Sequence, residues 1–296
     1  MYLRLLSIPL SMQQMAGSDP TSIPKPVQIP MIYIVGNSFC GSTLLGFLLS
    51  ANPDIIFLGE LKIKTWLRER SCSCGNSLEE CPFYGSYFST FNEIKKSVFA
   101  EVYQRSIFSL LFRRDQIISE DAVLKMESFY HSISERISST YPEANYIVDS
   151  SKSIWLLNGW LHTSLAKDIK IIWLTRKLKP SMASFTKRGF KFYHSLLSIV
   201  ANNLLTKYYL KWNRINYLKL DYSAFYDQYA DIAHQTSSFL NIPIPVDYIN
   251  HSNHHVISGN SITKKEFTGN FKGLHKDEEW RSVLTKNQKR ILSWVE

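Results

Sequence analysis

The amino-acid sequence predicts an α/β fold with a P-loop-like parallel β-sheet that is covered by helices on both faces. Short apolar runs rich in β-branched residues alternate with longer stretches of helical pattern, which is the order that builds parallel sheets. The apolar runs are continuous, as expected of strands buried on both faces. With 296 residues, 45% of them hydrophobic, the chain is long enough for one large domain or at most two small ones.

Each apolar run ends at a glycine or a polar cluster, and this sets the expected elements. Strands are expected at 31–35, 54–58, 145–148, 169–174 and 217–220. Helices are expected at 43–50, 93–118, 120–140, 153–166 and 223–240, and a polar, cysteine-containing loop at about 68–86. We expect a flexible N-terminal leader over residues 1–30, because residues 11–30 are rich in Ser, Gln and Pro, and a single domain over 31–296. In such sheets the ligand binds at the carboxyl ends of the strands.

Composition narrows the class of protein. The net charge of +9 suits a polyanionic partner, but solubility or a membrane surface would explain it equally well. No run of like charges is typical of a nucleic-acid-binding tail, so no nucleic-acid partner is expected. The N-terminus lacks the pattern of a signal peptide, and no stretch approaches the roughly 20 apolar residues that span a bilayer. We therefore expect a cytoplasmic protein without a transmembrane segment.

The loop from Gly36 to Thr43 has the spacing G-x-x-x-x-G-S-T between an expected strand and an expected helix. Such a loop turns backbone N–H groups around a phosphate, and the helix N-terminus adds partial positive charge. The ATP-binding version carries Lys where this chain has Ser42, which counts against a kinase or an ATPase. A glycine-rich turn that holds no ligand is the alternative for the loop alone.

Further motifs follow the loop in a characteristic order. They are Gly41-Ser42-Thr43-Leu44-Leu45, Asn52-Pro53, Gly59-Glu60, Val148-Asp149-Ser150-Ser151-Lys152, Leu174-Thr175-Arg176, His255-Val256-Ile257-Ser258-Gly259-Asn260 and Trp280. With these motifs the chain resembles the sulfotransferases that use 3′-phosphoadenosine 5′-phosphosulfate (PAPS), and more narrowly their bacterial branch. The resemblance spans nearly the whole chain from residue 31 and implies the sulfotransferase fold.

The resemblance implies transfer of a sulfonate group from PAPS, as co-substrate, to a hydroxyl of a glycan, lipid or small molecule, with no metal required. Its implied contacts with PAPS are Asn37, Ser38, Phe39, Cys40, Gly41, Ser42, Thr43, Arg176, Ser184, Gly259, Asn260 and Lys264. Arg176 and Ser184 would hold the 3′-phosphate, since a guanidinium gives a forked grip on phosphate. Alternatively, Arg176 forms a structural ion pair and Ser184 is an ordinary helix serine.

Two residues are the candidates for catalysis. The resemblance makes Glu60 the general base, a task that suits a carboxylate if partial burial raises its pKa. Lys152 would steady the sulfonate or the leaving phosphate. The alternatives are a surface glutamate that caps the next segment and a solvent-exposed lysine.

The chain also departs from the family pattern. Phe39 and Cys40 stand where many sulfotransferases carry a basic residue, so Lys152, Lys62 or Lys64 replaces the missing cation, or turnover is slow or absent. In the latter case the protein is a nucleotide-binding module that has lost catalysis.

Two segments have no assigned role. The cysteines at 72, 74 and 81 are one ligand short of a tetrahedral zinc site, and a fourth ligand from elsewhere, a disulfide or a plain loop are the alternatives. The stretch 187–194 mixes cations with aromatic residues and is either part of an acceptor groove or a solvated helix face.

Overall fold

The computed structural model describes residues 28–62, 71–85, 102, 118–246, 255–268, 273–276 and 278–296. Most of the expected leader and of the helix expected at 93–118 lies outside these residues. The strands are β1 (Met31–Gly36), β2 (Ile55–Gly59), β3 (Tyr146–Lys152), β4 (Ile169–Thr175) and β5 (Tyr217–Asp221). The helices are α1 (Ser42–Leu49), α5 (Glu120–Thr140), α6 (Ile154–Trp160), α7 (Leu178–Lys187), α8 (Phe192–Trp212), α9 (Tyr229–Leu240), α10 (Ser261–Thr268), α11 (Trp280–Val283) and α12 (Lys286–Val295). Short 3-10 turns, η1 (Ser164–Asp168) and η2 (Tyr222–Ala224), precede β4 and follow β5.

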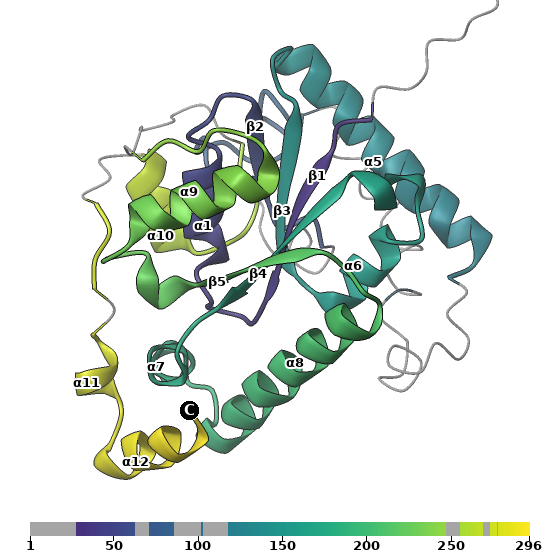
Figure 1. The fold of residues 1–296 in the computed structure, drawn as a ribbon. Coiled ribbons are helices and arrows are strands. Elements are labelled where there is room, and N and C mark those ends of the chain that lie inside the picture. Colours follow the sequence, from purple (N-terminus) through teal and green to yellow (C-terminus); the bar gives the residue numbers. More distant parts are fainter. Residues whose placement is uncertain are drawn as a thin grey trace, which may run out of the picture.

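The five strands form one sheet in the order β2-β3-β1-β4-β5, and every pair is parallel (Figure 1). This confirms the predicted α/β class. Because β1 lies between β3 and β4, the segments that follow these three strands meet at the same edge of the sheet. The phosphate-loop candidate, the Asp-Ser-Ser-Lys motif and Arg176 are therefore neighbours.

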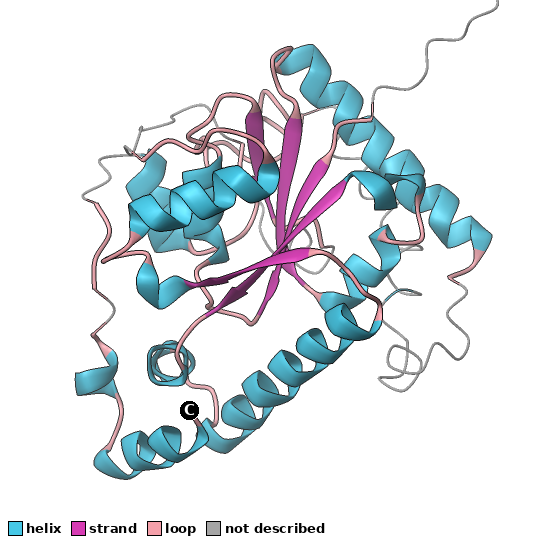
Figure 2. Cartoon of the chain, in the orientation of Figure 1, coloured by secondary structure: helices cyan, strands magenta, loops and turns pink. Residues whose placement is uncertain are grey.

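Helices cover both faces of the sheet (Figure 2). Alternate residues of β1 point to opposite sides: Tyr33 belongs to one hydrophobic cluster and Ile34 to the other. The first cluster includes side chains of α5, α6 and α8, such as the fully buried Trp160, and the second includes those of α1, α9 and α10. This two-sided burial explains why the strands have continuous apolar sequences.

Serine side chains cap the starts of α5 and α6. The Ser119 hydroxyl accepts a hydrogen bond from the Ala122 N–H at the start of α5, and Ser153 does the same for Leu156 in α6. The helix expected at 153–166 is shorter than predicted, because α6 ends at Trp160 and η1 follows. The helix expected at 223–240 is likewise η2 followed by α9.

The segment 255–260 returns to the outer edge of β2. The Ile257 N–H donates to the Leu58 carbonyl (3.0 Å), and the Glu60 N–H donates to the Ile257 carbonyl (3.3 Å). These bonds pair the edge strand of the sheet and bring the late His-Val-Ile-Ser-Gly-Asn motif beside the first loop. In the part of the chain described here, no helix is long and apolar enough to cross a membrane.

Candidate active site

The loop between β1 and α1 depends on two glycines. A Cβ at Gly36 would lie 2.5 Å from the Leu174 carbonyl of β4, so only glycine allows the strands to approach this closely. Gly41 has φ of 94° and caps α1, and a Cβ there would lie 2.0 Å from the Tyr222 ring. The chain can therefore turn sharply into α1 and direct the first turn of this helix toward the carboxyl edge of the sheet.

The first residues of the loop are held by the protein itself. The Asn37 amide donates to Asn203 of α8 (2.7 Å) and accepts from Asn202 (2.8 Å). Ser38 is exposed at the turn, whereas Cys40 is buried beneath it, and burial raises the pKa of its thiol. Asn37 and Cys40 thus hold the first part of the loop in place.

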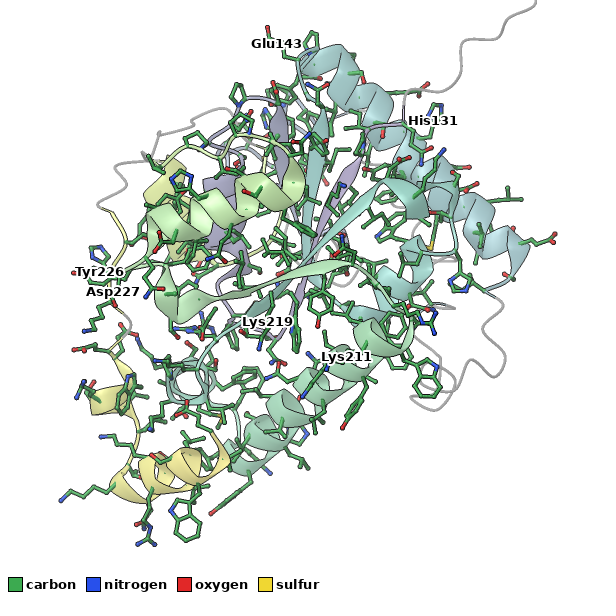
Figure 3. The ribbon with its side chains drawn as sticks, viewed as in Figure 1. His131, Glu143, Lys211, Lys219, Tyr226 and Asp227 are labelled. Carbon is green, nitrogen blue, oxygen red and sulfur yellow. The ribbon has the colours of Figure 1, made fainter. Side chains whose placement is uncertain are left out.

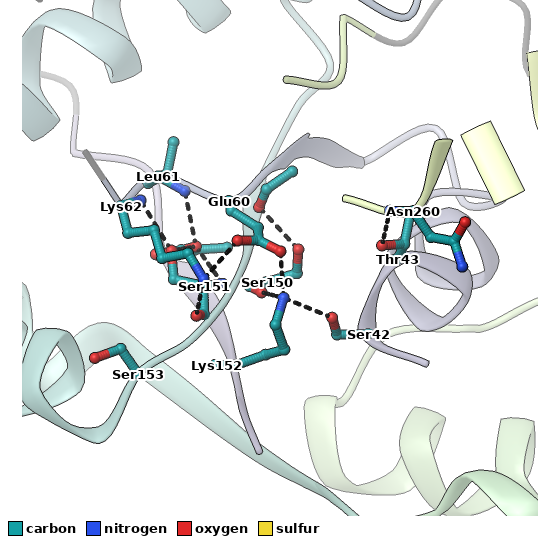
Figure 4. Close-up of polar contacts among 12 residues, drawn as sticks. Ser42, Thr43, Glu60, Leu61, Lys62, Ser150, Ser151, Lys152, Ser153 and Asn260 are labelled. Carbon is teal, nitrogen blue, oxygen red and sulfur yellow. Dashed lines mark hydrogen bonds and ion pairs between the residues drawn. The ribbon is translucent and has the colours of Figure 1, made fainter. Parts of the chain in front are cut away.

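Glu60 forms an ion-paired cluster at the carboxyl end of β2 (Figure 4). One carboxylate oxygen, Oε1, contacts Lys152 Nζ, and the other, Oε2, lies 2.7 Å from Lys62 Nζ. Burial by itself raises the pKa of Glu60, but Lys152 and Lys62 outweigh it, so the pKa lies below its ordinary value. Glu60 is therefore a paired carboxylate, and the condition that burial raises its pKa is not met in this arrangement.

Lys152 joins this cluster to the loop (Figure 4). Its Nζ lies 3.3 Å from Ser42 Oγ and 3.0 Å from the Ser150 carbonyl. The residue has a left-handed backbone (φ 65°), which bends the chain as β3 ends. Of the three cations expected to replace the missing basic residue, Lys152 is the one seen against the loop; Lys62 lies one step further away on Glu60, and Lys64 is outside the described residues.

The other residues of the Asp-Ser-Ser-Lys motif hold the backbone on either side of Glu60. Asp149 Oδ1 accepts hydrogen bonds from the Leu61 N–H (3.1 Å) and from the Ser151 N–H and hydroxyl. Ser150 Oγ donates to the Gly59 carbonyl (3.0 Å). These residues belong to β3 rather than to a loop, and their side chains bond to the last residue of β2 and to the backbone that follows it. Asp149 is fully buried, and burial raises its pKa to about 6.

Arg176 and Ser184 meet on the other side of the loop. Arg176 Nη1 lies 3.3 Å from Ser184 Oγ and also donates to the Phe39 carbonyl. The guanidinium lies 4.8 Å from the centre of the Tyr222 ring. The two residues form a polar end to the site that is tied directly to the loop.

A cavity of about 870 Å³ opens beside Arg176. Its walls come from the end of β4, from η2, and from α7, α8, α10 and α11, and they include Leu44, Tyr222 and Trp280. Figure 3 shows two of its lining residues, Tyr226 and Asp227, beyond the carboxyl end of β5 and far from His131 and Glu143. A cavity of this volume is in the range that holds a nucleotide-sized ligand.

The segment 257–260 completes the loop's surroundings. The Asn260 N–H donates to Thr43 Oγ1 (3.0 Å), and a Cβ at Gly259, where φ is 95°, would lie 2.8 Å from the same oxygen. Lys264 lies in α10, which packs on α1 and contributes Thr263 and Glu266 to the cavity lining. Gly259 and Asn260 therefore lie beside the first loop, and Lys264 is in the first turn of the helix that follows.

Phe39 belongs to an aromatic cluster that includes part of the stretch 187–194. Its ring packs edge-on against Phe185, with 4.7 Å between ring centres, and Phe190 lies 6.5 Å away. The Arg188 guanidinium lies 4.2 Å from the centre of the Phe39 ring, whereas Lys187 pairs with Glu279 at the surface. This part of the stretch thus supports the loop and brings a second guanidinium near it.

Solved structures that align with most of the chain are sulfotransferases. A sulfotransferase domain from the olefin synthase of Synechococcus PCC 7002 aligns over 90% of this chain and 94% of its own, with 18% identity and a TM-score of 0.49. A sulfotransferase domain from the curacin biosynthetic pathway aligns over 90% and 97%, with 15% identity and a TM-score of 0.47. A sulfotransferase from Mycobacterium avium aligns over 91% and 76%, with 12% identity and a TM-score of 0.36.

No family model matches the chain, and no curated protein matches it in sequence. At these identities and at TM-scores below 0.5, the structural alignments establish neither the family nor the activity. The function therefore rests on the chain's own residues.

Proposed function

We propose that the protein is a sulfotransferase that moves a sulfonate group from PAPS to a hydroxyl of a glycan, lipid or small molecule. The observation that carries the proposal is the pair of cations on either side of the Gly41-Ser42-Thr43 turn. Lys152 contacts Ser42 on one side, and Arg176, bound to Ser184, contacts the Phe39 carbonyl on the other. PAPS carries anionic groups at both ends of its ribose, so a two-ended cationic site suits it.

In the proposed reaction, an acceptor oxygen forms a bond to the sulfur of the donor while the bond from sulfur to the bridging phosphate oxygen breaks. The phosphate oxygen keeps the electron pair and becomes the 5′-phosphate of adenosine 3′,5′-bisphosphate. The acceptor proton goes to the Glu60 carboxylate. Lys152 neutralises the charge that develops on the phosphate side, which is where fixed charge lowers the barrier most. Because the leaving group is a stable anion, the proposal includes no metal in this step.

The low pKa of Glu60 fits this scheme only if one of its lysine partners can move. Lys152 already contacts both Glu60 and Ser42, so an arriving sulfonate would draw its ammonium toward the loop. Weakening of that ion pair raises the pKa of Glu60 and makes the carboxylate a better base. Donor binding and activation of the base are thereby coupled through one side chain.

The first test is calorimetric titration of the protein with adenosine 3′,5′-bisphosphate. We expect binding that weakens in Arg176→Ala and is not reproduced by ATP with magnesium. Absence of binding at millimolar nucleotide would overturn the proposal. Magnesium-dependent ATP hydrolysis that the bisphosphate leaves unchanged would favour a kinase-like protein instead.

The second test is transfer of labelled sulfonate from PAPS to a panel of hydroxyl acceptors and to a cell extract. Glu60→Gln removes the base, and Lys152→Met removes the cation. Each is expected to lower the rate about 10²–10³-fold, the range measured when one transition-state contact is lost. Lys62→Met is the matched control, since Lys62 pairs with the same carboxylate but its ammonium bonds to the Ser151 carbonyl rather than to Ser42. Nucleotide binding without any transfer would support the alternative, a nucleotide-binding protein that has lost catalysis.

A further inference from the structure

The structure gathers the cysteines at 72, 74 and 81 around one histidine from the end of the chain. Their sulfur atoms and a ring nitrogen of His255 all lie within 4.8 Å of one another. Cys74 Sγ is 3.8 Å from Cys81 Sγ, while Cys72 Sγ and Cys81 Sγ are 3.5 and 3.1 Å from His255 Nδ1. All three thiols are free, so no disulfide forms among them. His255 therefore supplies the fourth ligand that the cysteine segment lacks, although it is 174 residues from Cys81 in sequence.

Two of the six distances between these four atoms match those of a tetrahedral zinc site. With bonds of about 2.3 Å to sulfur and about 2.05 Å to nitrogen, the edges of a zinc tetrahedron measure about 3.8 Å between two sulfurs and about 3.5 Å between sulfur and nitrogen. The separations of Cys74 from Cys81 and of Cys72 from His255 equal these values. The pair formed by Cys81 and His255 is a few tenths of an ångström shorter.

A tight turn of the backbone directs the sulfur atoms of the cysteines toward one another. The Gly75 N–H bonds to the Cys72 carbonyl (3.0 Å) and the Cys72 N–H to the Asn76 carbonyl (3.0 Å), which closes a tight turn at Gly75, where φ is 93°. Backbone hydrogen bonds reach the Cys72 sulfur from Cys74 and the Cys81 sulfur from residues 83 and 84. Such donors stabilise thiolate ligands.

We propose that Cys72, Cys74, Cys81 and His255 bind one Zn²⁺ ion. Three thiolates and one imidazole in a tetrahedron favour zinc over harder cations. Because all four positions are taken by protein atoms, the ion is structural and takes no part in the chemistry at Glu60. His255 binds through Nδ1, so its remaining ring proton is on Nε2.

The surroundings of His255 fit a complex of Zn²⁺ with three thiolates and one neutral imidazole. The net charge of this complex is −1. The His255 ring stacks on Phe83, with ring centres 5.6 Å apart and planes 13° apart, and its carbonyl accepts from Tyr84 Oη (2.8 Å). The Arg136 guanidinium lies 5.8 Å from the centre of the Phe83 ring and donates to the Phe83 carbonyl. A fixed cation on this side offsets the negative charge of the complex.

The zinc would fasten two segments that are far apart in sequence, the one that holds the three cysteines and the one that begins at His255. His255 precedes Val256, whose N–H donates to Ser73 Oγ (2.9 Å), and Ile257, which pairs with β2. The same short segment ends at Asn260, which bonds to Thr43 in the loop. Loss of the ion is therefore expected to weaken both the pairing of Ile257 with β2 and the contact of Asn260 with the loop.

The test is the metal content of the full chain, purified without an affinity histidine tag or chelator and measured by inductively coupled plasma mass spectrometry. We expect roughly one zinc per chain. Cys72→Ser, Cys81→Ser and His255→Ala should each lower the zinc content at least several-fold. Two matched controls should keep it: Cys40→Ser, a buried cysteine outside the cluster, and His234→Ala, an exposed histidine on α9.

A second measurement on the wild-type chain avoids variants that fail to fold. Exchange of zinc for Co²⁺ should give the intense visible bands of tetrahedral cobalt and a sulfur-to-cobalt charge-transfer band in the near ultraviolet. A metal-free chain that binds no cobalt, a disulfide among the three cysteines found by mass spectrometry, or stoichiometric iron in place of zinc would each overturn the proposal. The result does not depend on whether sulfonate transfer is detected.

Discussion

The buried carboxylate of Asp149 lets the electrostatics of the site be tested through stability. Its side chain is fully buried, Oδ1 accepts three hydrogen bonds, and Oδ2 has no partner among the described residues. Burial raises the pKa from 3.8 to about 6. At about 1.4 kcal/mol per pH unit, ionisation in the folded state costs about 3 kcal/mol at neutral pH.

The sign follows from proton binding. Below pH 3.8, Asp149 is protonated in both states and carries no penalty. As the pH rises toward 6 the unfolded chain ionises first, so the folded state loses stability, and above that the penalty is constant. Asp149→Asn keeps the Oδ1 acceptor and cannot ionise. Its unfolding free energy relative to wild type should therefore rise by about 2 kcal/mol between about pH 4.5 and about pH 7.5.

The assay is urea unfolding of both proteins at a series of pH values, with the difference in unfolding free energy plotted against pH. Asp227→Asn is the matched control for loss of one negative charge, because Asp227 is exposed. The unpartnered amide nitrogen of the variant adds a constant cost of about 1–2 kcal/mol, which shifts the plot but leaves its slope unchanged. Parallel curves for Asp149→Asn and wild type would refute the reasoning.

Two further predictions concern the end of β2 at Gly59 and the pair formed by Arg176 and Ser184. Gly59→Ala should cost about 2–4 kcal/mol of unfolding free energy, because φ is 92° and a Cβ would lie 2.0 Å from the Ile257 carbonyl. Gly189→Ala has a similar φ, 76°, but no atom within 4 Å, so it should cost only about 1–2 kcal/mol; equal losses in thermal denaturation would contradict this. Arg176→Lys should weaken binding of adenosine 3′,5′-bisphosphate about 10-fold and Ser184→Ala about 3-fold, as measured by calorimetry. Because the two side chains share a hydrogen bond, the double variant should lose less than the product of these factors, and strict additivity would speak against their contact.

The sheet could be predicted from the sequence because its strands are buried on both faces. Continuous apolar runs placed four of the five strands within one residue of their observed bounds. The exception is β3, which continues through Asp149, Ser150 and Ser151 to Lys152. Those polar residues indicated a loop, and only the neighbouring backbone at Gly59 and Leu61 explains why they remain extended.

Long apolar helices were harder to predict. The sequence from Phe192 to Trp212 forms α8, yet no single face of it is apolar: Tyr193 and Leu197 are exposed, while Ile199 and Leu210 are buried. Helical periodicity is the signal that identifies a helix, and here it is weak.

The sequence predicted which residues lie near one another in the site, but not their electrostatic interactions. Glu60, Lys152 and Arg176 were expected near the loop, because the carboxyl ends of adjacent parallel strands meet. The lowering of the Glu60 pKa could not be expected from the sequence, since it depends on Lys152, which is 92 residues away. His255 is a comparable case, because its position beside the cysteines results from the return of the chain to β2.

The bond between Asn260 and Thr43, which joins residues 217 positions apart, has a consequence for synthesis on the ribosome. The nascent chain makes the loop early, but Ile257 and Asn260 emerge only after most of the protein has been translated. Until then the apolar strand β2 has an unpaired edge, which is a site for aggregation or for chaperone binding. The arrival of one short segment then closes that edge and completes the wall of the loop, so the loop cannot reach its final geometry before the sheet is protected.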